Sequence, residues 1–330
     1  MIIKTVARDT VQAALELACR APSVHNTQPW RWQVTDRSIQ LRADMNRWLP
    51  ATDPDGRDML LSCGAWLHHL RVALASLNVE ATVHRLPDPA EPDLLAVIDI
   101  QPGAGASSSV AAAEQAAVIG RRRTDRRRFV NWHVPAAFLK DLTDCAAEQG
   151  ALLRVVTDPV ALDTLAIAIR TAVVEHTGSS AYDAELATWS GRRHSADGVA
   201  VGSVPAPGRH RDGTSVRRFA GGALVDTGAD THNVATLLVL GTSSDDALSQ
   251  LRAGEAMSAV LLLATTQGLG SSPFSEPLEV EGTRALLRDE VLGGTLSPQM
   301  VLRVGWPPAT GPVPPKSARL SSSDRSDPLG

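Results

Sequence analysis

Two stretches decide the fold of this chain: GAWLHHLRVALASLNVE (Gly64–Glu80) and GEAMSAVLLLATTQGLG (Gly254–Gly270). The second can be laid on the first without a gap. Each predicts a long helix of small and apolar residues that leads into a tight connection. We expect these helices over about residues 57–78 and 249–266. Because both are apolar on most sides, they should lie buried in the middle of the fold.

The elements around the two long helices also recur, in the order helix, strand, long helix, strand. Helical periodicity and strand-like runs predict helices over 9–21, 110–119, 135–149 and 159–175, and strands over 30–35, 38–43, 81–86, 94–100, 151–156, 234–241 and 300–305. A recurring order of this kind predicts an internal duplication.

Composition places the chain among proteins with a large core. It has 330 residues, of which 43% are hydrophobic and 21% charged, and a net charge of −4. The negative charge argues against a protein devoted to nucleic acid or to an acidic membrane surface. Three cysteines without CxxC or zinc spacing fit a reducing compartment. Charged residues early in the chain break any signal-peptide core, and no apolar run is long enough to cross a bilayer, so we expect a cytoplasmic protein.

Residues 21–30 (APSVHNTQPW) form a polar loop ahead of a strand. Pro22 and Pro29 stiffen it, because proline fixes φ. Between them stand hydroxyl, imidazole and amide side chains, which suit reading the edge of a flat heterocycle. An ordinary turn rich in hydrogen-bonding side chains remains the other interpretation.

Six arginines stand within residues 121–128 (RRRTDRRR). They could form a solvated helix end, where cations complement the helix dipole. They could also clamp a phosphate, since arginine offers paired donors to phosphate oxygens and Thr124 adds a hydroxyl. A nucleic-acid patch is disfavoured by the acidic chain and the lack of interleaved aromatics. Spacing alone leaves the solvated face and the anion site open.

Gly268-Leu269-Gly270 would let backbone approach a ligand closely. It lacks the third glycine of a dinucleotide fingerprint, and Pro273 stands where the helix of that motif should continue. Gly268 alone is more simply a helix C-cap. The histidines show no metal spacing, and no lysine sits in a glycine-rich phosphate motif.

Taken together, four motifs resemble the nitroreductase-like FMN flavoproteins, and among them the Acg type. They are Ala21-Pro22-Ser23-x-x-Asn26-x-Gln28-Pro29-Trp30, Arg122-Arg123-Thr124-x-Arg126-x-x-Phe129, Gly268-Leu269-Gly270-Ser271 and Val304-Gly305-Trp306-Pro307. The resemblance implies an α+β nitroreductase-like fold with two pseudo-symmetric halves fused in one chain. Each half would have a central mixed, mainly antiparallel sheet flanked by helices.

The order of the motifs departs from that of an ordinary nitroreductase subunit. The Pro-Ser loop stands in the first half, and the Arg-Arg-Thr segment and Gly-Leu-Gly turn stand in the second. The resemblance therefore implies halves at 1–105 and 106–330, with one complete FMN site. The product would be a monomer that mimics the family's homodimer. The polar segment 176–232 is a candidate lid over that site.

The resemblance also implies site residues. Arg122, Thr124 and Arg126 would anchor the flavin phosphate and ribityl chain, and Lys316 or Arg319 would add a second phosphate contact. The loop would reach the flavin through Pro22, Ser23, Asn26 and Gln28. Gly270 and the stretch Ser272, Pro273, Phe274 and Ser275 would follow the isoalloxazine ring. No catalytic residue and no metal is implied, because the flavin carries the redox chemistry.

The implied function is reduction of a nitro compound, a quinone or another small electron acceptor by NAD(P)H through FMN. The alternative is a protein that stores or sequesters FMN beneath the lid with little turnover. Neither function involves nucleic acid or a membrane.

Overall fold

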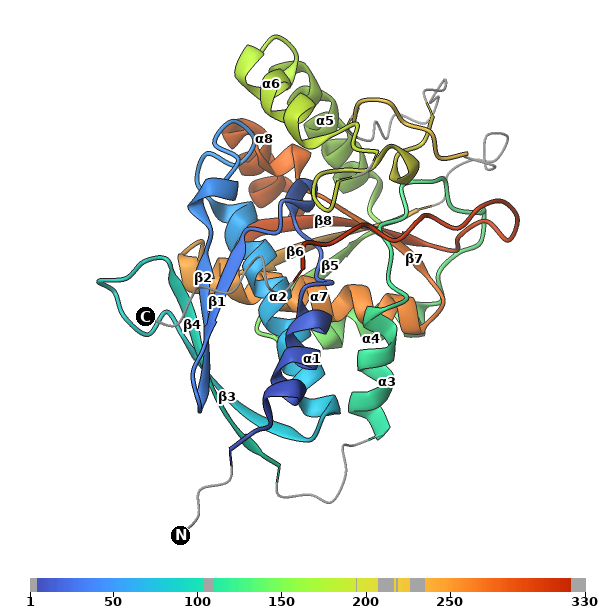
Figure 1. Ribbon diagram of the computed structural model, residues 1–330. Coiled ribbons are helices and arrows are strands. Elements are labelled where there is room, and N and C mark those ends of the chain that lie inside the picture. Colours follow the sequence, from blue (N-terminus) through green and yellow to red (C-terminus); the bar gives the residue numbers. More distant parts are fainter. Residues whose placement is uncertain are drawn as a thin grey trace.

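The computed structural model describes residues 5–103, 110–193, 195–206, 217, 219–225 and 235–321 (Figure 1). Its strands form two four-stranded sheets. The first has the order β1-β2-β4-β3 and the second the order β5-β6-β8-β7. The strands are β1 (Trp30–Val34), β2 (Ser38–Ala43), β3 (Val79–Arg85), β4 (Leu94–Pro102), β5 (Leu152–Val156), β6 (Thr236–Thr242), β7 (Gly270–Phe274) and β8 (Ser297–Gly305).

The two sheets repeat each other in detail. All named strands pair antiparallel, and each sheet carries a register shift at the same place. In the first sheet the shift follows Leu41, which pairs with Ala96. In the second it follows Leu240, which pairs with Met300. A shared bulge at corresponding strands confirms the expectation of two pseudo-symmetric halves.

The two long helices cross between the sheets. Helix α2 (Arg57–Ser76) and helix α7 (Ala247–Thr266) make the most extensive helix contact of the described fold, as Figure 1 shows. They meet at Gly64 and Gly254, the first residues of the two aligned stretches. A Cβ on Gly64 would lie 2.0 Å from the carbonyl oxygen of Leu251, and one on Gly254 would lie 2.1 Å from that of Leu61. Glycine is required at both positions because the backbones touch there.

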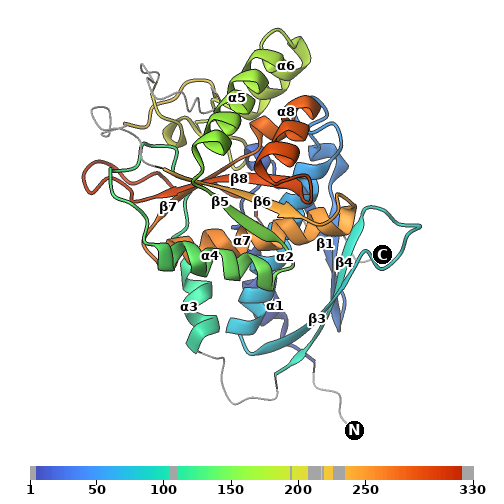
Figure 2. The same cartoon turned by 180° about the vertical axis from the view of Figure 1, so that it is seen from behind.

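Further helices cover the sheets and the long pair. Helix α1 (Arg8–Ala18) packs on α2, and α4 (Ala136–Glu148) packs on α7. Helix α3 (Val110–Ile119) contacts both long helices. Figure 2 shows α5 (Pro159–His176) and α8 (Glu281–Leu286) on the face of the second sheet opposite α7, with α6 (Ser180–Trp189) beyond α5.

The principal core is shared between the halves. One continuous cluster of buried apolar side chains includes Trp30, Trp32 and Trp66 from the first half and Leu240, Val260 and Leu302 from the second. A smaller cluster lies between α5 and the outer face of the second sheet. Because both halves contribute to the same core, neither sheet buries its long helix without the other.

The sequence predicts no strand at β7; Gly268-Leu269-Gly270 is expected to form a tight turn after the long helix. In the structure Gly270–Phe274 form a strand that pairs with β8. Proline cannot donate to a strand ladder, but β7 is the edge strand of its sheet, where this loss is tolerated. Gly268 does take the left-handed conformation of a helix end (φ 79°), and Asn78 takes it at the corresponding end of α2 (φ 56°). A parallel bridge joins Ser271 at this edge to Thr124.

Candidate functional site

A cavity of about 1010 Å³, open solvent at its mouth included, lies between the two halves. Eleven of the thirteen predicted cofactor contacts line it. These are Pro22, Ser23, Asn26, Arg122, Thr124, Arg126, Ser272, Pro273, Phe274, Ser275 and Arg319. The fold thus brings the loop of the first half, the arginine segment and β7 of the second half, and the C-terminal tail to one place.

The loop 21–30 is held in a constrained conformation. Three of its residues that are not glycine have a positive φ: His25 (46°), Asn26 (57°) and Gln28 (54°). Ser23 Oγ accepts from the Gln28 N–H at 2.9 Å, and Ser62 Oγ in α2 accepts from the Val24 N–H at 3.1 Å. Backbone conformations of this kind cost energy and concentrate at functional sites. The loop is therefore a rigid cavity wall and not an ordinary solvated turn.

Gln28 and Gly270, the two remaining predicted contacts, lie outside the cavity lining. The Gln28 side chain is buried, donates to the Ala196 carbonyl at 2.9 Å and accepts from the Leu320 N–H at 3.1 Å. It thereby joins the loop to the tail. A Cβ on Gly270 would lie 2.7 Å from Phe129, so this glycine gives room to the ring that ends the arginine motif.

The structure separates the arginines that the sequence left together. Arg122 and Arg126 line the cavity, whereas Arg121 is exposed. Arg127 forms a buried ion pair with Asp125, whose Oδ2 lies 2.6 Å from its Nη2. The solvated-face interpretation therefore holds for Arg121, and the cavity-facing arginines are available to an anion.

Three cations of the cavity wall, Arg122, Arg126 and Arg319, are desolvated and stand close to other arginines. Burial and the neighbouring Arg123 lower the pKa of Arg122 to about 10. Burial and Arg217 lower the pKa of Arg126 to about 10, and burial and Arg122 lower that of Arg319 to about 9. In the described residues, Arg122 Nε and Nη1 and Arg319 Nε have no hydrogen-bond partner. An anion among these groups would relieve their repulsion and complete their hydrogen bonds.

Strand β7 and the arginine segment are joined directly. The Asp125 N–H donates to the Ser271 carbonyl at 2.8 Å, next to the bridge between Thr124 and Ser271. Beyond β7, the Ser275 hydroxyl donates to Glu279 Oε1 at 2.6 Å. The contacts of Ser271 with Thr124 and Asp125 fix the wall formed by residues 272–275 relative to Arg122 and Arg126.

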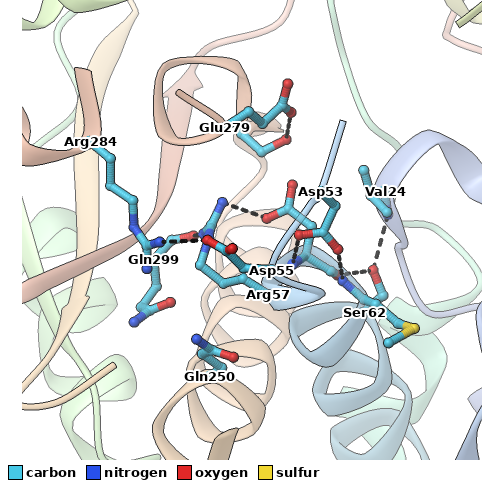
Figure 3. A network of polar contacts seen from close by, with 12 residues as sticks. Val24, Asp53, Asp55, Arg57, Ser62, Gln250, Glu279, Arg284 and Gln299 are labelled. Carbon is cyan, nitrogen blue, oxygen red and sulfur yellow. Dashed lines mark hydrogen bonds and ion pairs between the residues drawn. The ribbon is translucent and has the colours of Figure 1, made fainter. Parts of the chain in front are cut away.

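An acidic network that the sequence did not predict stands at the start of α2, as Figure 3 shows. Asp53 accepts from the N–H groups of Asp58 and Met59, both at 2.9 Å. Burial and the adjacent Asp58 raise the pKa of Asp53 to about 7. Arg57 Nη2 lies 2.7 Å from Asp58 Oδ1, and Arg57 also donates to the Gln299 carbonyl. Of this network, Asp58 lines the cavity.

Described parts of the predicted lid also reach the cavity. Arg217 donates to His25 Nε2 and to Glu279, and the Phe219 ring meets the His25 ring edge-on at 5.4 Å. The guanidinium of Arg126 lies 5.1 Å from the centre of the Phe219 ring. Burial, followed by Arg217, lowers the pKa of His25 well below its usual value, so that its ring accepts while neutral. Residues 194, 207–216, 218 and 226–232 of this segment lie outside the described residues.

The base of the same segment is fastened to the first half. Asp197 pairs with Arg47 at 3.0 Å, and Glu185 in α6 accepts from the N–H groups of Ala51 and Thr52. In the part of the chain that is described, no group of His, Cys, Asp and Glu could hold a metal ion, and no helix is long and apolar enough to cross a membrane.

Comparison with known proteins identifies relatives along nearly the whole chain. A Mycobacterium tuberculosis protein named "Putative NAD(P)H nitroreductase Rv3131" is 44% identical over 319 residues, which cover 94% of this chain and 89% of that protein. A second protein of that organism, named "Putative NAD(P)H nitroreductase acg", is 35% identical over 318 residues, covering 95% and 94%. The chain belongs to the Acg-type nitroreductase-like family. No family model matches it.

Solved structures similar to this Acg-type chain include an FMN- and NADPH-dependent nitroreductase, NfnB, from Sphigopyxis sp. strain HMH. It has a TM-score of 0.43 and 17% identity and covers 66% of this chain and 99% of that one. NfnB from Mycobacterium smegmatis, in complex with NADPH, has a TM-score of 0.38 and 18% identity, with coverage of 61% and 90%.

Proposed function

We propose that this chain binds one FMN and uses NAD(P)H to reduce a nitro compound, a quinone or a similar small acceptor. The observation that carries the proposal is the cluster of Arg122, Arg126 and Arg319 in the cavity wall. Desolvation and neighbouring arginines lower the pKa of each, and among the described residues Arg122 Nε and Nη1 and Arg319 Nε have no hydrogen-bond partner. The names of the M. tuberculosis relatives, in which NAD(P)H and nitroreductase appear, support the same function.

The residues of the cavity fit FMN chemically. A phosphate dianion would supply acceptors to the unpaired nitrogens of Arg122 and Arg319, and the Thr124 hydroxyl could donate beside it. The wall of Ser272–Ser275 would hold the ring of the flavin, with the rigid loop at Pro22–Asn26 on the other side of the cavity. When bound, the flavin supplies the hydride chemistry. The chain would hold its phosphate, orient its ring and exclude water.

We propose one FMN per chain because, in the first half, the place that corresponds to this cavity is occupied by internal ion pairs. Continued without a gap, the alignment of the long stretches brings Arg85 to the position of Ser275. Arg85 forms a paired interaction with the buried Glu255, at 2.7 and 2.9 Å. Arg71 donates to the same carboxylate at 2.7 Å and to Gln149 Oε1 at 3.0 Å. Both cations thus share one buried carboxylate, whereas Arg122 Nε and Nη1 in the cavity have no hydrogen-bond partner among the described residues.

We infer halves at about 1–105 and 106–330 and a monomer that carries the site made by two subunits in an ordinary nitroreductase. Segment 176–232 would act as its lid, and the protein would work in the cytoplasm without nucleic acid or membrane.

The visible absorption spectrum of the purified protein, before and after anaerobic NADPH, tests this function. We expect the two absorption bands of an oxidised flavin, with about one FMN per chain, and rapid bleaching by NADPH. If the protein carries no flavin and does not bind added FMN, the proposal is wrong. If the bands bleach with dithionite but not with NADPH, the reductase is excluded and storage of FMN is favoured.

Storage is a second candidate function, because Arg217 and Phe219 line the cavity from the lid segment. Side chains in that place would obstruct the approach of nicotinamide. The double variant Arg217→Ala with Phe219→Ala should then bleach faster with NADPH than the unmodified protein. Val225→Ala, in the same segment with a side chain 56% exposed, is the control. Equal bleaching rates in all three proteins would argue against a closed, storing site.

A further inference from the structure

The carboxylate of Asp58 is only half satisfied, although it is buried in the cavity wall. The residue is 2% exposed, and its Oδ1 lies 2.7 Å from Arg57 Nη2. Within the described residues, its Oδ2 has no hydrogen-bond donor. Buried polar atoms are nearly always hydrogen-bonded, and a buried polar atom without a partner is destabilising, the more so when it is charged.

The position of Asp58 is fixed by its backbone. Its N–H donates to Asp53 Oδ1 at 2.9 Å, and its carbonyl accepts from the Ser62 hydroxyl at 2.6 Å. Ser62 in turn holds the cavity loop through the Val24 N–H, as Figure 3 shows. Arg57 and the N-terminal end of α2 both favour negative charge at this position. The free oxygen is therefore a preorganised acceptor and not a side chain that can turn away.

The surroundings of Asp58 specify the kind of group it can bind. Burial, and after it the nearby charge of Asp58, raises the pKa of Asp53 and of Glu279, so three carboxyl groups stand near one another here. Arg57 and Arg217 are paired with Asp58 and Glu279, respectively, and Arg284 is paired with Asp245. An anion would be repelled here, whereas it is attracted to Arg122, Arg126 and Arg319. The cavity thus has an anion-binding wall and a separate acceptor.

We propose that Asp58 recognises the N–H edge of a planar heterocyclic amide or imide bound in the cavity. This inference rests on the proposed function. Two ligands of that function carry such an edge: the imide N–H of the flavin ring and the carboxamide of nicotinamide. A charge-assisted hydrogen bond from either one to Oδ2 would orient its ring while the arginines hold a phosphate.

The test compares Asp58→Asn with the unmodified protein and with Asp55→Asn, whose side chain is 74% exposed. In Asp58→Asn the amide oxygen would face Arg57, which leaves an N–H₂ donor opposite the donor of the ligand. The first probe pair is FMN and N3-methyl-FMN, measured by quenching of flavin fluorescence. The second is NADPH and its 3-acetylpyridine analogue, which lacks the amide N–H₂, measured as KM on the FMN-loaded protein.

If the flavin imide is the donor, the unmodified protein and Asp55→Asn bind FMN about tenfold to a hundredfold more tightly than N3-methyl-FMN, and Asp58→Asn loses this preference. If nicotinamide is the donor, FMN affinity is unchanged in Asp58→Asn, and the preference for NADPH over its analogue is lost. If the unmodified protein binds FMN but shows neither preference, the role of Asp58 is wrong, while the proposed function stands. A protein that does not bind FMN overturns the proposed function and this inference together. If Asp58→Asn does not fold, the two preferences of the unmodified protein still show whether an N–H group of FMN or of NADPH is recognised.

Discussion

His68 Nδ1 and Ser258 Oγ lie 2.9 Å apart at the contact of α2 and α7. The two residues stand four positions after Gly64 and Gly254, so they occupy the same place in the two aligned stretches. Two equivalent positions can touch each other only at an axis that relates the halves. The hydrogen bond therefore lies on the pseudo-twofold axis of the fold, and burial lowers the pKa of His68 to about 3, which keeps its ring neutral.

The close approach at this axis predicts a strong effect of a single methyl group. Gly64→Ala and Gly254→Ala each place a Cβ about 2 Å from a backbone oxygen of the other helix, so the helices must separate. We expect each variant to lose about 3 kcal/mol or more of unfolding free energy, measured by chemical denaturation. Gly282→Ala is the control, because α8 leaves open space there and alanine favours a helix. Equal stability of all three variants would contradict the close crossing.

The duplication could be predicted from the sequence because the two repeated segments are long apolar helices. Gly64–Glu80 and Gly254–Gly270 were aligned by residue type alone, and both helices lie where that pattern placed them. Strand β7 could not be predicted, since Pro273 is unfavourable in a strand until its place at a sheet edge is known. That place depends on pairing with β8, which is a contact distant in sequence.

The repulsion within the cavity predicts opposite effects on stability and on FMN affinity. Arg122→Met removes a buried cation of the cavity wall while keeping much of the side-chain volume. In the absence of ligand we expect the free energy of unfolding to rise by on the order of 1–3 kcal/mol, because a desolvated charge is removed. FMN affinity should fall about tenfold or more, since a charge-assisted hydrogen bond to phosphate is lost.

The adjacent Arg121 offers a matched control for this prediction. It is exposed, so Arg121→Met should change neither the stability nor the FMN affinity by more than a small amount. Thermal denaturation with and without FMN measures both effects. If Arg122→Met lowers the stability of the ligand-free protein, the arginines are not in repulsion.

The arginine run shows why the site could be predicted only in part. Six neighbouring arginines present one chemistry in the sequence, and the fold separates them into the cavity-facing Arg122, the exposed Arg121 and the Arg127 paired with Asp125. Asp58 gave no signal, because a single acid in the first turn of a helix is ordinary. Its importance arises from burial by elements of both halves.

The stability of the protein should depend on pH through Asp53. Its pKa is raised to about 7 in the folded protein by burial and by Asp58, against 3.8 for an unperturbed aspartate. Between these values the native state holds a proton that the unfolded chain has released. The free energy of unfolding contributed by this group is therefore highest below pH 4 and is lost as the pH rises towards 7.

We expect this loss to be on the order of 2–4 kcal/mol between pH 4 and pH 7. In Asp53→Asn the corresponding slope should be absent, whereas the exposed Asp55→Asn should retain it. Urea denaturation at a series of pH values gives the slopes. A slope in Asp53→Asn equal to that of the unmodified protein would assign the pH dependence to another group.

The ion pairs at Glu255 should stabilise the fold and take no part in FMN binding. Glu255 is 1% exposed and faces both Arg71 and Arg85, so Glu255→Gln leaves two partly buried cations without their charge partner. Because an uncompensated charge is costly, we expect a loss of about 3–5 kcal/mol in unfolding free energy. The exposed pair of Lys140 and Asp144 is the control, and Asp144→Asn should cost less than about 1 kcal/mol. FMN stoichiometry should stay near one per chain in both variants, since the proposed FMN site is the cavity of Arg122 and Arg126. A second FMN bound by Glu255→Gln would show instead that this carboxylate alone closes an otherwise competent site.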